Sequence, residues 1–284
     1  MSRESLVSIV VPVYNAADTV ESAIRSLLQQ TYQRLEILVV DDGSVDNSLA
    51  IAAGIRDSRI RVVAQEHRGL VMTLNHGCAL AQGEYIARLD ADDLADERRI
   101  AAQVTFMEDH PEVGLLGTWA RIEGKDAEVW TYEPPVGDRA LRRYLLWDNP
   151  FVHSSVIFRP VAFREVGGYP EGLAEEYRLW IHMARSWKIA ILPEVLVTHR
   201  IYEASYTRKQ RRAAALRGRL MAQWEAARSL GPWHEAVPAL GVTCGTYLLA
   251  LMGGEAETAL RRLVRVSTRR LRGFRDSSPG DRSR

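Results

Sequence analysis

The sequence contains few cysteines, which limits the chemistry to consider. Its 284 residues include Cys78 and Cys244, which lie far apart and in no metal-ligand or redox spacing. We expect two buried small side chains, no disulfide framework and a reducing, cytoplasmic compartment. We also expect no signal peptide, because residues 1–6 are polar and no apolar run precedes a cleavage site.

Long uncharged runs are almost absent as well. The exception, residues 236–254, is long enough to cross a bilayer, which takes about 20 residues. Pro238 and several glycines and threonines dilute its apolarity, so we interpret it as a buried or interfacial helix, with a spanning helix as the alternative. The net charge of +1 gives no reason to expect a nucleic-acid partner.

Acidic residues are missing between Glu257 and Asp276, where the chain is basic instead. An expected helix there has two interpretations: a solvated helix packed on the rest of the chain, or a peripheral membrane contact on an anionic surface, such as the inner face of the plasma membrane. Apolar residues that can share one side of it are Leu260, Leu263, Val264, Leu271 and Phe274; the arginines are Arg261, Arg262, Arg265, Arg269, Arg270, Arg272 and Arg275.

Short apolar runs alternate with helical patterns along the first hundred residues. Strands are predicted at 7–13, 35–40, 59–63 and 85–89, and helices start at the capping signals of Asp18 and Asp46 and span 70–81. Further on, we predict strands at 151–158 and 189–197, a helix at 174–187, and only helix after Thr207, broken at 231–232 and 253–254. The pattern predicts an α/β fold: a doubly wound, mostly parallel sheet with flanking helices and a helical C-terminal extension.

Ligands bind such sheets outside the carboxyl ends of the strands. Those ends are residues 12–15, 41–44 and 90–93, and two of them are acidic. Because the first end lacks a glycine-rich turn and no P-loop is present, a nucleotide's phosphates would need another partner. Asp90 and Asp92 can bind a divalent cation, Mn²⁺ or Mg²⁺, and so bring it to a diphosphate, although an acidic turn is the alternative interpretation of these two residues. Asp41 and Asp42 fit either a tight turn or hydrogen bonds to a base N–H.

Five motifs, in this order and spacing, make the chain resemble the family 2 glycosyltransferases. They are residues 7–15, 28–32, 36–44, 83–86 and 89–93. The resemblance covers about residues 5–205 and implies the GT-A fold and inversion at the anomeric carbon. It implies a GT-A domain at 1–205, with a nucleotide-sugar half at about 1–110 and an acceptor half at about 111–205. Residues 206–284 then form the helical extension.

The resemblance also implies roles for donor-binding residues. Pro12, Tyr14 and Asp42 match the nucleoside pocket, and Asn15 and Asp41 belong to the same two strand ends. Asp90 matches a ribose or metal-shell position, and Asp92 matches the residue that ligates the metal. Arg200 matches an arginine that can bind phosphate by a forked contact.

The catalytic base is implied by residues 174–180, which are similar to the family's Glu-Asp motif. Glu176 falls on the base position and Glu175 lies beside it. Glutamate is one methylene, about 1.5 Å, longer than the usual aspartate, so either neighbour is a candidate base. Other departures are Arg178 where a second aspartate is common, Tyr202 where histidine is frequent, and Leu74 in place of a basic residue, which gives Leu74 no donor role.

The implied activity is sugar transfer from a nucleotide-diphosphate sugar to an acceptor hydroxyl in cell-surface polysaccharide or glycoconjugate biosynthesis. The acceptor is expected to be a glycan, a lipid-linked molecule or a small molecule. Residues 151–155 and 166–169 resemble the family's segment that leads to the acceptor. Two alternatives remain: a catalytically degenerate nucleotide-sugar binding protein, and a nucleotidyltransferase, which usually needs a glycine-rich triphosphate loop.

Overall fold

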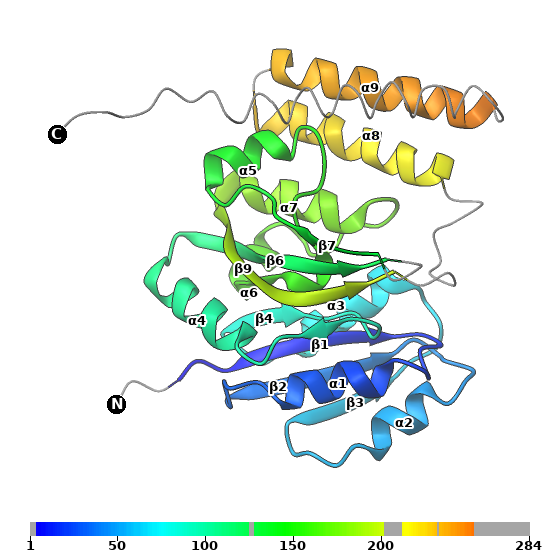
Figure 1. Cartoon of the computed structure of the whole chain (residues 1–284), viewed down its shortest axis with the longest axis vertical. Coiled ribbons are helices and arrows are strands. Elements are labelled where there is room, and N and C mark those ends of the chain that lie inside the picture. The colour runs from blue at the N-terminus through cyan, green and yellow to red at the C-terminus, as the bar shows by residue number, and fades with distance from the viewer. Residues whose placement is uncertain (1–3, 125–127, 202–211, 232, 253–284) are drawn as a thin grey trace.

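The computed structural model describes residues 4–124, 128–201, 212–231 and 233–252 (Figure 1). Within them a nine-stranded sheet has the order β3-β2-β1-β4-β8-β6-β9-β5, and β7 pairs with β6. The strands are β1 (Val7–Val13), β2 (Leu35–Asp41), β3 (Ile60–Ala64), β4 (Tyr85–Arg88), β5 (Leu94–Ala95), β6 (Val113–Glu123), β7 (Val129–Tyr132), β8 (Ile157–Phe158) and β9 (Lys188–Arg200). The helices are α1 (Val20–Leu28), α2 (Ser48–Gly54), α3 (Leu70–Leu80), α4 (Arg99–Asp109), α5 (Asp138–Tyr144), α6 (Pro160–Glu165), α7 (Glu175–Ser186), α8 (Arg212–Ser229) and α9 (Trp233–Met252), with a 3-10 turn η2 (His153–Ser155).

The amino-terminal part of the sheet is parallel. β1 lies between β2 and β4, and β2 pairs with β3. Every residue of β1 is buried, because helices cover both faces and alternate side chains enter different cores. This double burial explains the continuous apolar runs, and the four predicted strands agree with the structure to within one residue.

The second part of the sheet is mixed. β8 is antiparallel to β4 and β6, β5 is antiparallel to β9, and β6 and β9 are parallel. The 11-residue β6 was not predicted, because Gly114 and Gly117 interrupt its apolar pattern. A Cβ on Gly114 would meet Trp187 at 2.6 Å, and one on Gly117 would meet Phe151 at 2.7 Å. These aromatic rings supply the apolar cover that the strand's own sequence lacks.

Two cores lie on opposite faces of the sheet. Val10 and Leu38 pack with Leu74 of α3 and Trp180 of α7, whereas alternate residues such as Ile9 pack against α1, α2 and α4. The molecule is therefore a helix-sheet-helix sandwich, and Figure 1 shows α8 and α9 stacked beyond α5 and α7 at one end. Leu74 is fully buried in the first core, in keeping with its having no donor role.

The predicted starts of two helices need correction. α1 begins at Val20 with Thr19 as its N-cap and no side-chain cap, and Glu21 pairs with Arg25 at 2.6 Å, so the capping box at Asp18 is wrong. α2 has Asn47 at the N-cap, one residue later than predicted. Asp46 still accepts the Ser48 N–H at 2.9 Å and also binds the Ala17 N–H at 3.1 Å, which ties two loops together.

The predicted strand at 151–158 is wrong for most of its length. Only Ile157 and Phe158 form a strand, after the 3-10 turn of η2. His153, Ser154 and Ser155 are all buried, at 7%, 0% and 0% exposure. Three consecutive inward side chains are incompatible with the alternation of a strand but compatible with a tight turn.

The C-terminal extension is helical where it is described. Within the described residues, no helix combines the length and apolarity needed to cross a bilayer. α9 carries Pro238, and it is only partly buried, since Val237 and Val242 are 59% and 48% exposed. Cys244 on α9 is also exposed, so the expectation of two buried cysteines holds only for Cys78. Tyr202 and residues 253–284, with the basic segment, lie outside the described residues.

Candidate active site

One cavity opens at the carboxyl ends of β1, β2 and β4, with a volume of about 950 Å³. Six of the predicted site residues line it: Pro12, Tyr14, Asn15, Asp42, Asp90 and Asp92. Four others do not belong to its lining: Asp41, Glu175, Glu176 and Arg200. The fold thus brings three separate strand ends to one pocket, as expected for a parallel sheet.

Tyr14 and Asn15 shape one wall of the pocket. The Tyr14 ring is 48% exposed and stacks on the His67 ring, with centroids 4.3 Å apart. Asn15 has a φ of 50°, a left-handed conformation that asparagine tolerates better than most residues. Its side-chain oxygen accepts the Val45 N–H at 2.9 Å, and its own N–H donates to Ser44 at 3.0 Å. Asn15 therefore holds the first strand end against the second and leaves the Tyr14 ring facing the cavity.

Asp42 is buried and strongly hydrogen bonded. Its carboxylate accepts the Arg68 and Gly69 N–H groups at 2.9 Å each and the Gln65 amide at 2.7 Å, and it lies 2.9 Å from His67 Nδ1. Burial alone would raise the pKa of Asp42, but these hydrogen bonds outweigh it and lower the pKa. The residue is an anion that fixes the loop carrying His67 at the pocket wall.

Asp41 lies behind this wall. It is 2% exposed, and one oxygen accepts the Ser44 N–H at 3.1 Å. Its other oxygen is buried without a hydrogen-bond partner among the described residues. The geometry is that of a tight turn, and a direct contact between Asp41 and a donor stays a prediction.

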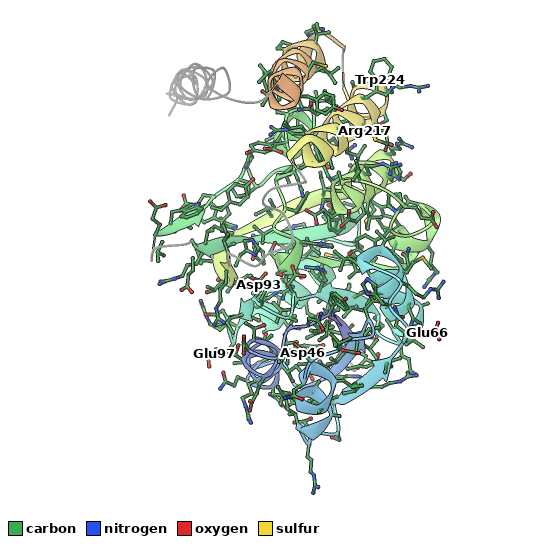
Figure 2. All side chains as sticks on the ribbon, turned by 90° about the vertical axis from the view of Figure 1, so that its right-hand side faces the viewer. Asp46, Glu66, Asp93, Glu97, Arg217 and Trp224 are labelled. Atoms are coloured by element: carbon green, nitrogen blue, oxygen red, sulfur yellow. The ribbon has the colours of Figure 1, made fainter. Side chains whose placement is uncertain are left out.

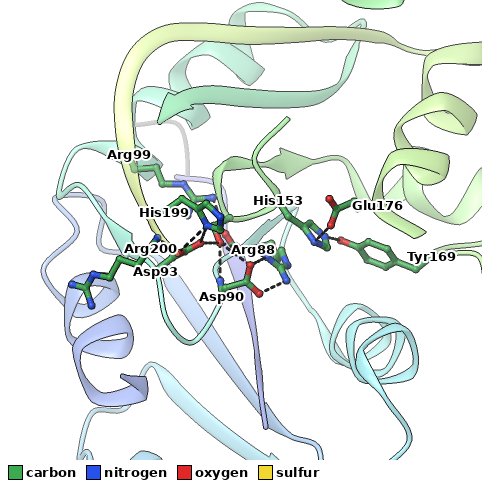
Figure 3. Close-up of polar contacts among 10 residues, drawn as sticks. Arg88, Asp90, Asp93, Arg99, His153, Tyr169, Glu176, His199 and Arg200 are labelled. Carbon is green, nitrogen blue, oxygen red and sulfur yellow. Dashed lines mark hydrogen bonds and ion pairs between the residues drawn. The ribbon is translucent and has the colours of Figure 1, made fainter. Parts of the chain in front are cut away.

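Asp90 is bound by a buried arginine. Both of its oxygens accept hydrogen bonds from Arg88, which is 2% exposed, and Ser154 donates to the same carboxylate at 3.1 Å. Burial would raise the pKa of Asp90, but Arg88 outweighs it and brings the pKa to about 2. Figure 3 shows Arg88 and His153 between Asp90 and Glu176, so the Arg88 guanidinium lies between these two carboxylates.

Asp90, Asp92 and Asp93 form a cluster in which one oxygen of each lies within 4.8 Å of the others. Asp93 is fully buried and committed to Ser154, to His199 at 3.0 Å and to the Arg200 N–H at 2.9 Å. Burial and then the charges of Asp90 and Asp93 raise the pKa of Asp92 to about 6. A pocket-lining carboxylate whose negative charge is opposed by its neighbours suits a hard divalent cation, so the residues fit Mn²⁺ or Mg²⁺.

His199 and Arg200 lie at the end of β9, across from this cluster. Burial would lower the pKa of His199, but the hydrogen bond and charge of Asp93 raise it above its ordinary value. The Arg200 guanidinium is 3.9 Å from Glu123, and Figure 3 shows it directed away from Asp90. Phosphate binding by Arg200 therefore stays a prediction.

The two candidate bases begin α7 and differ in their surroundings. Glu176 lies 2.8 Å from His153 Nδ1 and accepts the Asn149 amide at 3.2 Å. Burial would raise the pKa of Glu176, but His153 and Arg88 outweigh it and lower the pKa. Burial and the charge of Glu176 raise the pKa of Glu175. Glu176 is thus the neighbour kept as a carboxylate.

Four residues of the site were missed from the sequence: Arg88, Asn149, His153 and His67. Arg88 carried one signal, since a charge inside an apolar strand must have a buried partner. His153 lay in the predicted acceptor segment at 151–155 but was given no role of its own, and Asn149 gave no signal, because their partner Glu176 lies more than twenty positions away in the sequence. His67 likewise meets Tyr14 only through the fold.

Comparison with known proteins gives a family match. The family described as "Glycosyl transferase family 2" matches residues 8–167. An uncharacterized glycosyltransferase of Haemophilus influenzae is 31% identical over 221 residues, which are 71% of this chain and 67% of that protein. The amylovoran biosynthesis glycosyltransferase AmsE of Erwinia amylovora is 30% identical over 197 residues, 67% of this chain and 74% of that protein. The chain spans about two thirds of the length of the first curated relatives it matches.

Two solved structures share the fold. The mannosyltransferase PcManGT from Pyrobaculum calidifontis, in complex with GDP-Man and Mn²⁺, is 21% identical with a TM-score of 0.65, covering 93% of this chain and 81% of that one. TarS 1–349 of S. aureus, in complex with UDP-GlcNAc, is 19% identical with a TM-score of 0.66, covering 86% and 72%. At this identity they establish the GT-A fold alone.

Proposed function

The chain belongs to glycosyl transferase family 2, and from this premise we propose that it is a metal-dependent, inverting enzyme that uses a nucleotide-diphosphate sugar. The observation that carries the proposal is the position of Asp92 in the pocket lining, where burial and then the charges of Asp90 and Asp93 raise its pKa to about 6. Clustered carboxylates bind a divalent cation, and the bound cation in turn binds the oxygens of a diphosphate. The donors in the two similar structures, GDP-Man and UDP-GlcNAc, are of this class.

The donor nucleoside is proposed to lie along Pro12, Tyr14 and Asp42, where the exposed Tyr14 ring offers an aromatic face. Asn15 and Asp41 then support that wall from behind. Asp92 is the proposed direct ligand of Mn²⁺ or Mg²⁺, and Asp90, held by Arg88, contributes to the ribose or the outer metal shell. When bound, the cation would neutralise the charge that develops on the leaving diphosphate.

Glu176 is the proposed base. Its carboxylate accepts the proton of the acceptor hydroxyl while the acceptor oxygen bonds to the anomeric carbon. The bond from that carbon to the phosphate oxygen breaks, and its electron pair leaves with the nucleoside diphosphate. Attack from the face opposite the leaving group inverts the configuration, and no covalent enzyme intermediate is required. Glu175, with its raised pKa, is the weaker candidate.

A degenerate binding protein is disfavoured by the same geometry. In a protein without catalysis, the residue at the base position would need no hydrogen-bond partners. Glu176, however, is held as a carboxylate by His153 and Asn149. Membership of a glycosyltransferase family also removes the nucleotidyltransferase alternative.

We further propose where the chain acts. The similarity to AmsE, a glycosyltransferase of amylovoran biosynthesis, supports a role in cell-surface polysaccharide synthesis with a glycan or lipid-linked acceptor. The basic segment between Arg261 and Arg275 is proposed to contact the inner face of an anionic membrane. The proposed roles divide the chain into three parts: a nucleotide-sugar half at about 1–110, an acceptor half at about 111–205 and a helical extension at 206–284.

A thermal-shift panel tests the metal and the donor together. With Mn²⁺ present, one nucleotide sugar among UDP-glucose, UDP-GlcNAc and GDP-mannose should raise the melting temperature most, because ligands stabilise the state that they bind. In Asp92→Asn the Mn²⁺-dependent part of this increase should vanish, together with Mn²⁺-dependent release of nucleoside diphosphate, while the protein stays folded. Undiminished metal-dependent turnover in that variant would exclude Asp92 as the ligand.

A further inference from the structure

Helix α8 contacts both segments that surround the proposed base. It lies beyond the residues that match the family, which end at 167, and it belongs to the helical extension. We propose that α8 is a positioning element of the active site: it fixes the loop at 147–149, whose Asn149 holds one oxygen of Glu176 while His153 holds the other. This inference rests on the proposed role of Glu176 as the base.

The Glu176 carboxylate is gripped at both oxygens. Asn149 Nδ2 donates to Oε1 at 3.2 Å, and His153 Nδ1 lies 2.8 Å from Oε2. His153 Nε2 is in turn 2.9 Å from the Tyr169 hydroxyl, so the imidazole is fixed from both sides (Figure 3). A carboxylate has about four lone-pair sites, so each oxygen keeps room for a substrate hydroxyl.

The loop that carries Asn149 is pinned by α8. The Trp147 carbonyl accepts the Gln223 amide at 2.7 Å and the Arg219 guanidinium at 2.9 Å. Arg219 also pairs with Asp148 at 3.0 Å. Gln223 is 1% exposed, and a buried amide N–H that loses its hydrogen-bond partner destabilises the fold, so its bond to the Trp147 carbonyl is maintained. Both donors therefore fix the backbone at Trp147, two residues before Asn149.

The same helix also holds the start of α7. Glu225 accepts Arg178 at 2.9 Å and lies 2.8 Å from His182, both on α7. A Cβ on Gly218 would come within 2.8 Å of Leu173 Cβ, so the glycine lets α8 approach the entry to α7 closely. These contacts account for Arg178 at a position where aspartate is common, because an aspartate there would repel Glu225.

A glutamate at the base position needs this support. Its side chain has one more rotatable bond than aspartate, and a freely rotating carboxylate would seldom meet the acceptor hydroxyl in a reactive geometry. Contacts from Asn149 and His153 remove that freedom, and α8 makes the Asn149 contact rigid. The extension thus acts on the reaction through positioning, without touching the substrate.

The experiment uses the full chain with Mn²⁺, and UDP-GlcNAc or GDP-mannose as donor, with water as acceptor and released nucleoside diphosphate as the readout. Arg219→Met with Gln223→Leu removes both donors to Trp147. Asn149→Asp replaces the donor to Glu176 with a carboxylate that repels it, while its other oxygen can still accept the Phe151 N–H now 3.0 Å away. Arg228→Met, at an exposed position of α8, is the matched control.

The double variant and Asn149→Asp should each lower kcat about 10- to 100-fold while the donor KM changes less than about threefold, because positioning of a general base affects the reaction step. Arg219→Lys with Gln223 retained should restore most of kcat, and Arg228→Met should match the wild type. Wild-type kcat in the double variant, or a KM rise as large as the kcat loss, would overturn the inference. Wild-type turnover in Glu176→Gln would instead refute the proposed base.

Discussion

The side chains around Glu176 decide what that carboxylate can do. Left to burial alone its pKa would rise, and it would lose the charge that a base needs. His153, placed 2.8 Å away by the turn of η2, and the buried Arg88 reverse the sign. Glu175 lacks this balance, and its pKa is raised. Neighbouring glutamates on one helix turn thus acquire different chemistry from different surroundings.

His153→Phe tests this balance through the pH dependence of turnover. The base works deprotonated, so activity falls as pH drops through the pKa of Glu176. That pKa lies below its ordinary 4.5 in the wild type, and His153 is the largest cause that lowers it. Phenylalanine keeps the ring packing with Trp180 and Tyr169 but removes this cause, so the acid limb should move to higher pH.

The measurement is the rate of donor hydrolysis between pH 4 and pH 8. A variant with a lower rate but an unmoved acid limb would show that His153 only orients the carboxylate. His182→Phe is the control for the acid limb, since His182 lies on the same helix as Glu176 but pairs with Glu225 of α8 at 2.8 Å.

Prediction at the residue scale succeeded where a motif carried the information. Pro12, Tyr14, Asp42, Asp90 and Asp92 lie at the carboxyl ends of predicted strands, and the topology of a parallel sheet was enough to bring them to one pocket. The hydrogen-bond partners of those residues were not predicted, because a hydrogen bond such as that from Ser154 to Asp90 joins positions that are 64 residues apart in the sequence. No local pattern encodes such a pair, and only the packed fold creates it.

Elements were predictable when their burial was uniform. β1 and β2 are buried on both faces and have continuous apolar sequences. In β6, by contrast, two glycines are covered by the rings of Trp187 and Phe151 from other parts of the chain. The predicted strand at 151–158 has apolar residues on both sides of η2, but the polar side chains of η2 are buried, and Ser154 binds Asp90 and Asp93. The sequence pattern therefore fails to predict an element whose apolar packing or hydrogen-bond partners come from distant parts of the chain.

The start of α7 offers a test at the scale of an element. Its N-cap residue, Ala174, has φ 54° and ψ 42°, a left-handed conformation that costs a non-glycine residue about 1 kcal/mol. Ala174→Gly should therefore be neutral or raise the free energy of unfolding, because glycine adopts this conformation without strain. Chemical denaturation would measure the change.

The matched control is Ala53→Gly, at an exposed position within α2. In an ordinary helical conformation this change should destabilise by about 0.5–1 kcal/mol. Equal destabilisation by the two substitutions would show that the left-handed entry into α7 is not strained.

At the scale of the whole molecule, the C-terminal extension is not a separate body. Ala222, Ala226 and Ala236 belong to the same core as Leu146 and Trp180. Their small side chains let α8 and α9 pack closely on this core, at the end of the molecule opposite Asp46 (Figure 2). The predicted boundary near residue 205 therefore does not divide the core, and a division of roles there stays a prediction.

The membrane proposal concerns the part of the chain after this core. All proposed site residues precede residue 202, and the seven arginines between Arg261 and Arg275 follow α9. A chain ending at Gly254 should therefore keep donor turnover, yet lose binding to vesicles that contain anionic phosphatidylserine. Each arginine near such a surface contributes up to about 1 kcal/mol, so the loss in affinity should exceed about 100-fold at low salt.

Flotation of both chains with phosphatidylserine and with neutral phosphatidylcholine vesicles makes the comparison. Binding by the full chain should need the anionic lipid and weaken as salt rises, because screening shortens the range of the attraction. Equal flotation of the two chains would assign the contact to the exposed Val237 and Val242 of α9 instead, since these remain in the shorter chain. Flotation on neutral vesicles alone would remove the electrostatic argument, because apolar contact does not require a charged headgroup.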